Sequence, residues 1–201
     1  MKRHAAKLAS HGFRVLVPDI YKGKIGIDKE EASHLMSNLD WAVAIGEIGE
    51  AAKYLKDTER CAKVGITGFC MGGALSLCGA ATSEHISCAA PFYGIPDPKR
   101  VDVGVITSKA VQGHFGAEDA YAGFSDPASA RALEEKLKAA GNTDVEVFVY
   151  DGVGHGFLND TPEPYDSFEA RREAQGFAPY DAAQAELAWS RLVAFFKKQL
   201  A

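Results

Sequence analysis

The stretch Lys63-Val-Gly-Ile-Thr-Gly-Phe-Cys-Met-Gly-Gly-Ala-Leu75 decides the fold of this chain. A short β-type run leads through Gly68-Phe-Cys-Met-Gly72 into a segment of helix-forming residues. This order predicts a sharp turn from a strand into a helix with Cys70 at its apex, a nucleophile elbow in which cysteine takes the place of serine. The apex backbone of such a turn is strained, so Gly68 and Gly72 are both expected to be positions where a Cβ does not fit.

The chemistry of Cys70 follows from this placement. The turn is expected to lift the sulfur above the sheet at a helix N-terminus, where the helix dipole favours the thiolate, and Gly73 leaves room for the helix to pack on a strand. The alternative is a glycine-rich junction around a buried, inert cysteine.

Two later strands are each followed by a loop that carries a possible partner for Cys70. Ala110–Phe115 reads as a buried strand that ends in a turn with Glu118 and Asp119, and the alternating run Val145–Tyr150 precedes a glycine-flanked His155. Carboxyl ends of parallel strands meet at one edge of a sheet, so a nucleophile, a base and an acid are expected to meet there. Asp119 is preferred as the acid over its neighbour Glu118.

The remaining histidines and cysteines receive structural interpretations. His4, His11, His34 and His85 are expected to be solvated, and His114 is expected to be a packed or pocket-wall residue. No cysteine or histidine pair has zinc-finger spacing, so neither a metal nor another cofactor is expected.

Three motifs together resemble the dienelactone hydrolase family. They are Gly68-Phe-Cys-Met-Gly-Gly-Ala74, Gly113-His-Phe-Gly-Ala-Glu-Asp119 and Gly152-Val-Gly-His-Gly-Phe157, supported by His11-Gly-Phe-Arg-Val-Leu-Val-Pro-Asp-Ile-Tyr21 and Pro91-Phe-Tyr-Gly94. The resemblance implies an α/β-hydrolase fold with a mostly parallel sheet and flanking helices. It also implies a Cys70–His155–Asp119 triad, a thioester intermediate, and a lactone or activated carboxylic ester as the substrate. The amide N–H of Met71 would be one donor of the oxyanion hole.

The same resemblance indicates a shortened N-terminal part. The chain starts in what looks like the first helix after the family's third strand, so upstream strands and a loop with a second oxyanion donor are expected to be missing. Arg14–Val17 is then expected to be an inner strand of the sheet with one bare edge. Hydrolase activity is expected to be impaired, with a non-catalytic binding module as the alternative function. A redox sensor with Cys78 as the resolving thiol is disfavoured, since Cys78 lies about 12 Å further along the same helix.

Composition predicts a single domain over residues 1–201. The chain is 47% hydrophobic with a net charge of −5, which argues against nucleic acid and anionic membranes as partners. No apolar run approaches the roughly 20 residues of a spanning helix. Four cysteines without a disulfide pattern favour a reducing, cytoplasmic location; the oligomeric state is left open.

Alternating strand and helix patterns independently predict an α/β fold. Helices are expected after the Asp126-Pro127 cap with Leu133 and Leu137 buried, over residues 40–55, and over residues 182–199. The last of these is expected to bury Leu187, Leu192, Phe195 and Phe196. Residues 159–179 are expected to form an irregular surface excursion that covers the site. Five aromatic residues near the site loops are candidates for a pocket wall or for the core: Phe69, Phe115, Tyr121, Phe124 and Phe157.

Overall fold

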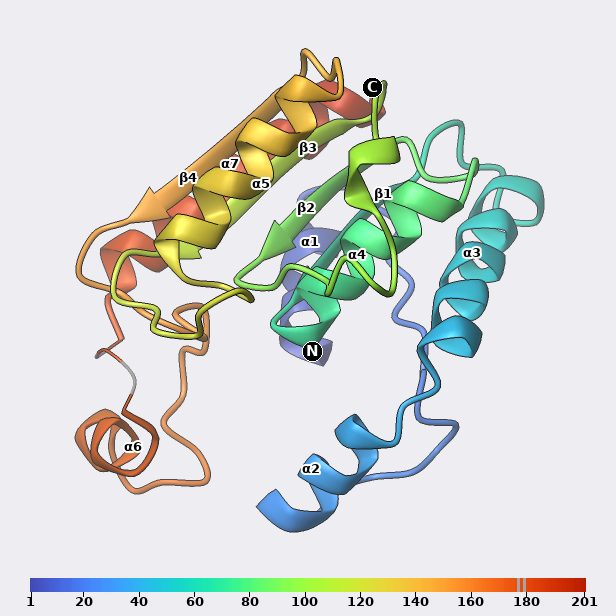
Figure 1. Ribbon diagram of the computed structural model, residues 1–201. Helices are drawn as coiled ribbons and strands as arrows, with labels where there is room; N and C mark the ends of the chain where they lie inside the picture. Colours follow the sequence, from blue (N-terminus) through green and yellow to red (C-terminus); the bar gives the residue numbers. More distant parts are fainter. Residues whose placement is uncertain (177, 179) are drawn as a thin grey trace.

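The computed structural model describes residues 1–176, 178 and 180–201. Helices and strands alternate along most of the chain (Figure 1). In order, the elements are α1 (Lys2–Ser10), α2 (Lys29–Ser37), α3 (Trp41–Asp57), β1 (Gly65–Phe69), α4 (Met71–Thr82), β2 (Cys88–Phe92), the 3₁₀ turn η1 (Val103–Val105), β3 (Ala110–Gly116), α5 (Pro127–Ala139), β4 (Val145–Tyr150), α6 (Phe168–Gln175) and α7 (Ala182–Leu200).

The strands form a parallel sheet in the order β1-β2-β3-β4. Helix α4 connects β1 to β2, and α5 connects β3 to β4. Because all strands run in one direction, the loops that follow β1, β3 and β4 emerge at the same edge. The α/β architecture expected from the sequence is therefore confirmed, and the edge that should hold the site exists.

Helices cover both faces of this sheet. In Figure 1, α4 and α5 lie on one face, and α1 and α7 lie on the other. Each face of the sheet has its own hydrophobic core, and the side chains of β2 alternate between the two. Those of Cys88, Ala90 and Phe92 pack with α7, and that of Ala89 packs with α4. This period of two is what a strand buried on both faces requires.

The two long C-terminal helices follow their sequence signals, with one exception. Asp126 caps α5 by accepting hydrogen bonds from the amides of Ala128 and Ser129, and Leu133 and Leu137 are buried. In α7, however, the prediction for Leu187 is wrong, because 42% of this residue is exposed. Ala185 and Ala188 occupy the buried face of that turn instead, so the close packing of α7 depends there on small side chains.

The prediction of a strand at Arg14–Val17 is also wrong. The segment forms no ladder with the sheet, and β2 is the neighbour of β1 among the described strands. A cavity of about 440 Å³ lies between the segment and β1, which keeps their backbones beyond hydrogen-bonding reach.

Residues 159–179 were expected to be irregular, but they contain helix α6. Ser167 caps this helix by accepting a hydrogen bond from the amide of Ala170. The side chain of Arg171 is buried and donates hydrogen bonds to the carbonyl oxygens of Asn159, Thr161 and Gly156. This arginine ties the segment to the residue that follows His155. Pro179, the end of the expected excursion, lies outside the described residues.

The turn between β1 and α4 depends on close backbone packing. Cys70 has φ 56° and ψ −122°, a positive-φ conformation that a residue with a side chain adopts only under strain. A Cβ on Gly68 would overlap the carbonyl oxygen of Gly72, and a Cβ on Gly73 would overlap the carbonyl oxygen of Phe92. Gly72 differs from the expectation, because a Cβ there would meet no atom within 4 Å. The steric demand on the elbow therefore falls on Gly68 and Gly73.

This difference gives a matched pair of substitutions. Gly68→Ala is expected to lower the free energy of unfolding by about 1–3 kcal/mol, because its methyl group forces the elbow apart. Gly72→Ala is expected to stay within about 1 kcal/mol of the parent, since it adds a methyl group to open space in a helix. Urea unfolding followed by circular dichroism measures both. Equal losses for the two variants would contradict the packing described here.

Candidate active site

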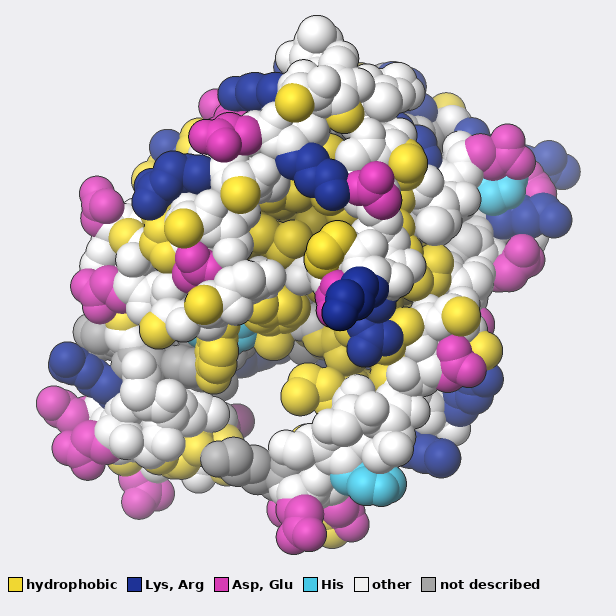
Figure 2. Space-filling model, viewed as in Figure 1, with side chains coloured by type: hydrophobic (Ala, Val, Ile, Leu, Met, Phe, Trp, Pro, Cys, Tyr) yellow, Lys and Arg dark blue, Asp and Glu magenta, His cyan; other side chains and the backbone are white. Residues whose placement is uncertain are grey.

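Cys70, His155 and Asp119 meet at the carboxyl edge of the sheet, although 85 residues separate the first two. The Nε2 atom of His155 lies 3.1 Å from the Sγ atom of Cys70. Its Nδ1 atom lies 2.8 Å from Oδ2 of Asp119. The imidazole thus bridges the sulfur and the carboxylate in one line of hydrogen bonds. In the space-filling view, apolar side chains border the hollow below this edge (Figure 2).

Each partner is held by the turn that follows its strand. The other oxygen of Asp119, Oδ1, accepts a hydrogen bond from the amide of Tyr121, and the backbone amide of Asp119 bonds to Gly116. After β4, the loop of His155 approaches the acid loop, where the amide of Glu118 donates to the carbonyl oxygen of Val153. A Cβ on Gly116 would overlap Val153, so the two loops need that glycine to come together.

Burial and charge oppose each other at His155. Burial lowers the pKa of the imidazole, but its hydrogen bonds with Asp119 and Cys70, and their negative charges, outweigh this effect and raise the pKa to about 9. The side chain of Asp119 is fully buried and that of His155 is 9% exposed, so water screens their interaction little. The arrangement therefore favours a proton on His155 at neutral pH.

Ser125 is a member of the site that the sequence reasoning missed. Its hydroxyl lies 3.2 Å from Nδ1 of His155, and the residue is fully buried. Nδ1 therefore has two oxygen neighbours, Ser125 and Asp119, which together fix the plane of the ring. A serine between Phe124 and Asp126 in a loop has no motif that distinguishes it, so only the fold could identify it.

The competing candidates occupy different places. Glu118 is exposed, whereas Asp119 is buried against the histidine. His114 is fully buried, stacks on Phe92, and has its Nδ1 atom 2.8 Å from the hydroxyl of Tyr150. Burial lowers the pKa of His114 to about 3, which keeps the ring neutral, so it is a packing residue.

His4 departs from the expectation of a solvated side chain. Its ring lies 4.7 Å from that of Phe69 and 5.3 Å from that of Trp189. Burial and the nearby N-terminal ammonium group lower its pKa. This histidine packs α1 against the end of β1, while His11 and His34 are exposed.

The five aromatic candidates divide into two groups. The rings of Tyr121 and Phe124 lie beside that of His155, with centroid distances of 4.8 and 6.1 Å. Phe115 and Phe157 are core residues, with 0% and 4% exposure, and Phe69 packs against Phe92. A further aromatic that the sequence reasoning missed, Tyr93, sets its buried ring edge-on to His155 at 5.2 Å.

Helix α4 begins directly after Cys70, which is its N-cap residue. Met71 is the first residue of this helix, so its amide has no acceptor within the helix. From the other side, the hydroxyl of Tyr21 lies 3.9 Å from Sδ of Met71. Burial is the larger cause that raises the pKa of Tyr21, and a negative charge on Cys70 would add to it.

The described residues hold no group of three histidine, cysteine or acidic side chains arranged for a metal ion. All four cysteines are free thiols, and Cys78 is buried. Within the described ranges, no helix has both the length and the apolar character to cross a membrane.

Comparison with known proteins gives one consistent result. A sequence profile of the dienelactone hydrolase family matches residues 1–200. The protein usf of Aquifex pyrophilus is 30% identical over 213 residues, which cover all of this chain and 81% of that protein. The carboxymethylenebutenolidase of Rhodococcus opacus is 29% identical over 212 residues, covering 98% of this chain and 75% of that protein.

Solved structures agree on the fold. A dienelactone hydrolase-like promiscuous phosphotriesterase from metagenomic libraries has a TM-score of 0.73 at 22% identity, over all of this chain and 80% of that chain. A putative dienelactone hydrolase from Klebsiella pneumoniae has a TM-score of 0.61 at 23% identity, over 90% of this chain and 73% of that chain. At such identities the likeness concerns the fold alone.

The pH dependence of activity tests the role of Asp119. We expect the active form to carry a protonated His155, so kcat/KM for an aryl ester is expected to fall as pH rises through about 9. Asp119→Asn removes a negative partner that raises the pKa of His155. The fall of kcat/KM at alkaline pH, the alkaline limb of the pH profile, should therefore move to lower pH. The rate should also fall by about 10²–10⁴.

Glu118→Gln is the matched control for this experiment, because it neutralises the adjacent, exposed carboxylate. It should leave both the limb and the rate unchanged. If Glu118→Gln moves the limb and Asp119→Asn does not, the acid has been assigned to the wrong residue.

Proposed function

Since the chain belongs to the dienelactone hydrolase family, we propose that it hydrolyses lactones and activated carboxylic esters with Cys70 as the nucleophile. Family membership makes the chain a hydrolase of lactones or esters and argues against a purely non-catalytic binding module. The proposal adds the residues, the covalent intermediate and the class of leaving group.

One observation carries this proposal. The hydrogen-bond distances are 3.1 Å from Sγ of Cys70 to Nε2 of His155 and 2.8 Å from Nδ1 of His155 to Oδ2 of Asp119. Both are short enough for proton transfer. A packing role would not need a strained backbone at the cysteine, nor a buried carboxylate placed on the far nitrogen of the same ring.

In the resting state of this mechanism, Nε2 of His155 already holds the proton of Cys70. In the first step, the thiolate forms a bond with the carbonyl carbon of the substrate. The carbonyl π electrons move to oxygen, and the resulting oxyanion accepts a hydrogen bond from the amide of Met71 at the positive end of α4. When the oxyanion collapses, the bond to the leaving oxygen breaks. That oxygen takes the proton from His155, and a thioester remains on Cys70.

In the second step, His155 removes a proton from water, which attacks the thioester carbonyl. Collapse of this second tetrahedral intermediate breaks the C–S bond and releases the acid, and the sulfur returns to its pair with His155. Asp119 keeps Nδ1 protonated and bonded throughout, so that Nε2 is the nitrogen that exchanges protons. Ser125 assists by holding the plane of the ring.

The nucleophile limits which substrates react. A thiolate attacks readily but is also a good leaving group, so a tetrahedral intermediate with a poor leaving group returns to the starting ester. Enol lactones and aryl esters release a stabilised oxygen anion, so their intermediates go forward. Tyr121 and Phe124 would border the apolar part of such a substrate beside His155. A reducing compartment such as the cytoplasm would keep Cys70 reduced and free to react.

Trapping the intermediate tests the assignment of Cys70. The protein is mixed with an aryl acetate, quenched with acid and digested, and the acyl group is located by mass spectrometry. The acetyl group is expected on Cys70. Cys78 and Cys88 should stay unmodified, because burial raises their pKa values to about 11 and about 12.

Two variants complete the test. Cys70→Ala should abolish both the label and turnover, whereas Cys61→Ala, which alters the other partly exposed thiol, should keep both. A label on Cys61, with Cys70 free during turnover, would refute the mechanism.

A further inference from the structure

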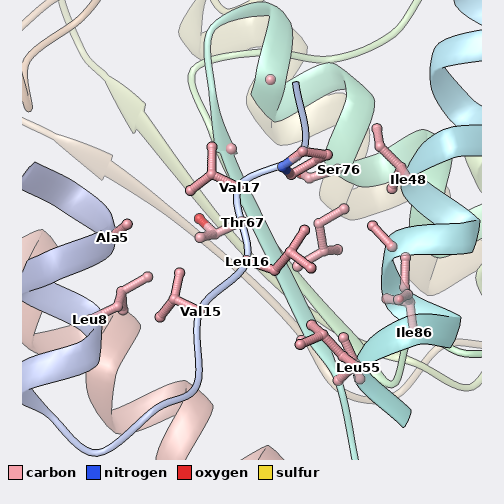
Figure 3. Close-up of a pocket in the computed structure, with 18 of the residues that line it drawn as sticks. Ala5, Leu8, Val15, Leu16, Val17, Ile48, Leu55, Thr67, Ser76 and Ile86 are labelled. Atoms are coloured by element: carbon pink, nitrogen blue, oxygen red, sulfur yellow. The ribbon is translucent and has the colours of Figure 1, made fainter. Parts of the chain in front are cut away.

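An apolar cavity of about 440 Å³ lies beside β1, in addition to the site at Cys70 (Figure 3). One wall is β1 itself, and the opposite wall is the segment Arg14–Val17. Helices α1, α3 and α4 contribute aliphatic side chains to the remaining walls, among them Leu8, Ile48 and Leu55. The mechanism makes no use of this cavity.

The β1 wall presents backbone polar groups. The carbonyl oxygen of Val64 and the amide of Cys70 both bond toward β2. Backbone groups of successive strand residues point to opposite edges, so those of Gly65, Thr67 and Phe69 point away from β2, toward the cavity. The described part of the chain provides no hydrogen-bond partner for this edge of β1.

The opposite wall resembles a strand that lacks its neighbour. In Figure 3, Val15 and Val17 point toward the side of α1, and Leu16 points toward Leu55 on α3, the alternation of an extended chain. The segment is parallel to β1, because Arg14 bonds to Glu59 before β1 and Tyr21 contacts Met71 after it. Among the described residues, the backbone of Arg14–Val17 likewise has no hydrogen-bond partner.

These two walls specify what fits between them. A small apolar molecule would fill the volume but leave both rows of N–H and C=O groups unpaired. An extended peptide offers such groups on both of its edges, about 4.8 Å from each neighbouring strand, and apolar side chains toward both helix layers. We propose that the cavity is a binding slot for an extended apolar polypeptide strand, which pairs with β1 and with Arg14–Val17 at once.

Peptide binding tests this proposal directly. The probe is a blocked heptapeptide with five alternating valine and isoleucine residues between terminal lysines, which matches the length of β1. It is expected to bind the full chain with one-to-one stoichiometry in a calorimetric titration. It should also slow hydrogen exchange at the amides of Gly65, Thr67 and Phe69 at least tenfold.

The decisive control is the same peptide N-methylated at alternate residues, which keeps the apolar side chains but cannot donate along one edge. It should bind at least tenfold more weakly. Leu16→Lys, which places a charge on the wall of the slot, should weaken binding by a similar factor, whereas Met36→Lys on α2, outside the cavity, should not. If Leu16→Lys does not fold, the N-methylated peptide still decides the question.

Three results would overturn the proposal. The first is the absence of binding by the unmodified peptide, or equal binding by its N-methylated form. The second is displacement of the peptide by dodecanoate without protection of the three amides, which would identify a cavity for small apolar molecules. The third is protection of these amides by a concentration-dependent dimer in the absence of peptide, which would assign the slot to a second copy of the chain.

Discussion

Close contact between glycines and backbone carbonyl groups fixes the position of the sulfur, and the remainder of the site depends on it. Gly68 packs on the carbonyl of Gly72, Gly73 on that of Phe92, and Gly94 on that of Cys70 itself. These contacts lock β1, the start of α4 and the end of β2 together at the apex of the turn. The strained conformation of Cys70 persists because the surrounding backbone leaves it no alternative.

Two loops that are distant in the sequence approach the fixed sulfur of Cys70. The parallel sheet delivers the acid loop after β3 and the histidine loop after β4 to the same edge, and glycines again allow the loops to touch. Once His155 is held between the sulfur and Asp119, its environment is dry, and burial alone would keep it neutral. Its interactions with Asp119 and Cys70 reverse that preference and favour the protonated ring.

The sequence predicts the features that depend on local backbone chemistry. The bounds of β4, the Asp126 cap of α5 and the placement of Asp119 and His155 after neighbouring strands all follow from periodicity, caps and turns. It fails where three-dimensional surroundings decide the outcome. Gly72 has open space beside it, Leu187 is exposed in α7, and Ser125 is recruited by a histidine that lies 30 residues away in the sequence.

The segment Arg14–Val17 shows the same limit in another form. Its run of β-type apolar residues is that of a strand, and its side chains alternate between two layers as a strand's do. A strand forms, however, only when a neighbour is within hydrogen-bonding distance. The sequence of a segment indicates where its side chains point, but it does not indicate whether a neighbouring strand lies within hydrogen-bonding distance. Helix α6 shows the opposite error, since an irregular segment was expected there and a helix forms. Its buried Arg171 donates hydrogen bonds to carbonyl groups that no local sequence pattern identifies.

The proposed mechanism depends on an ion pair between the thiolate of Cys70 and the protonated ring of His155, which Asp119 sustains. The most direct test is a ¹H NMR titration of the Cε1 proton of His155, before and after Cys70 is alkylated with iodoacetamide in a Cys61→Ser background. We expect a midpoint near pH 9 in the free protein and a clear fall after alkylation, because the sulfur then carries no charge. A midpoint near pH 6.5 in the free protein, or one that alkylation leaves unchanged, would contradict it.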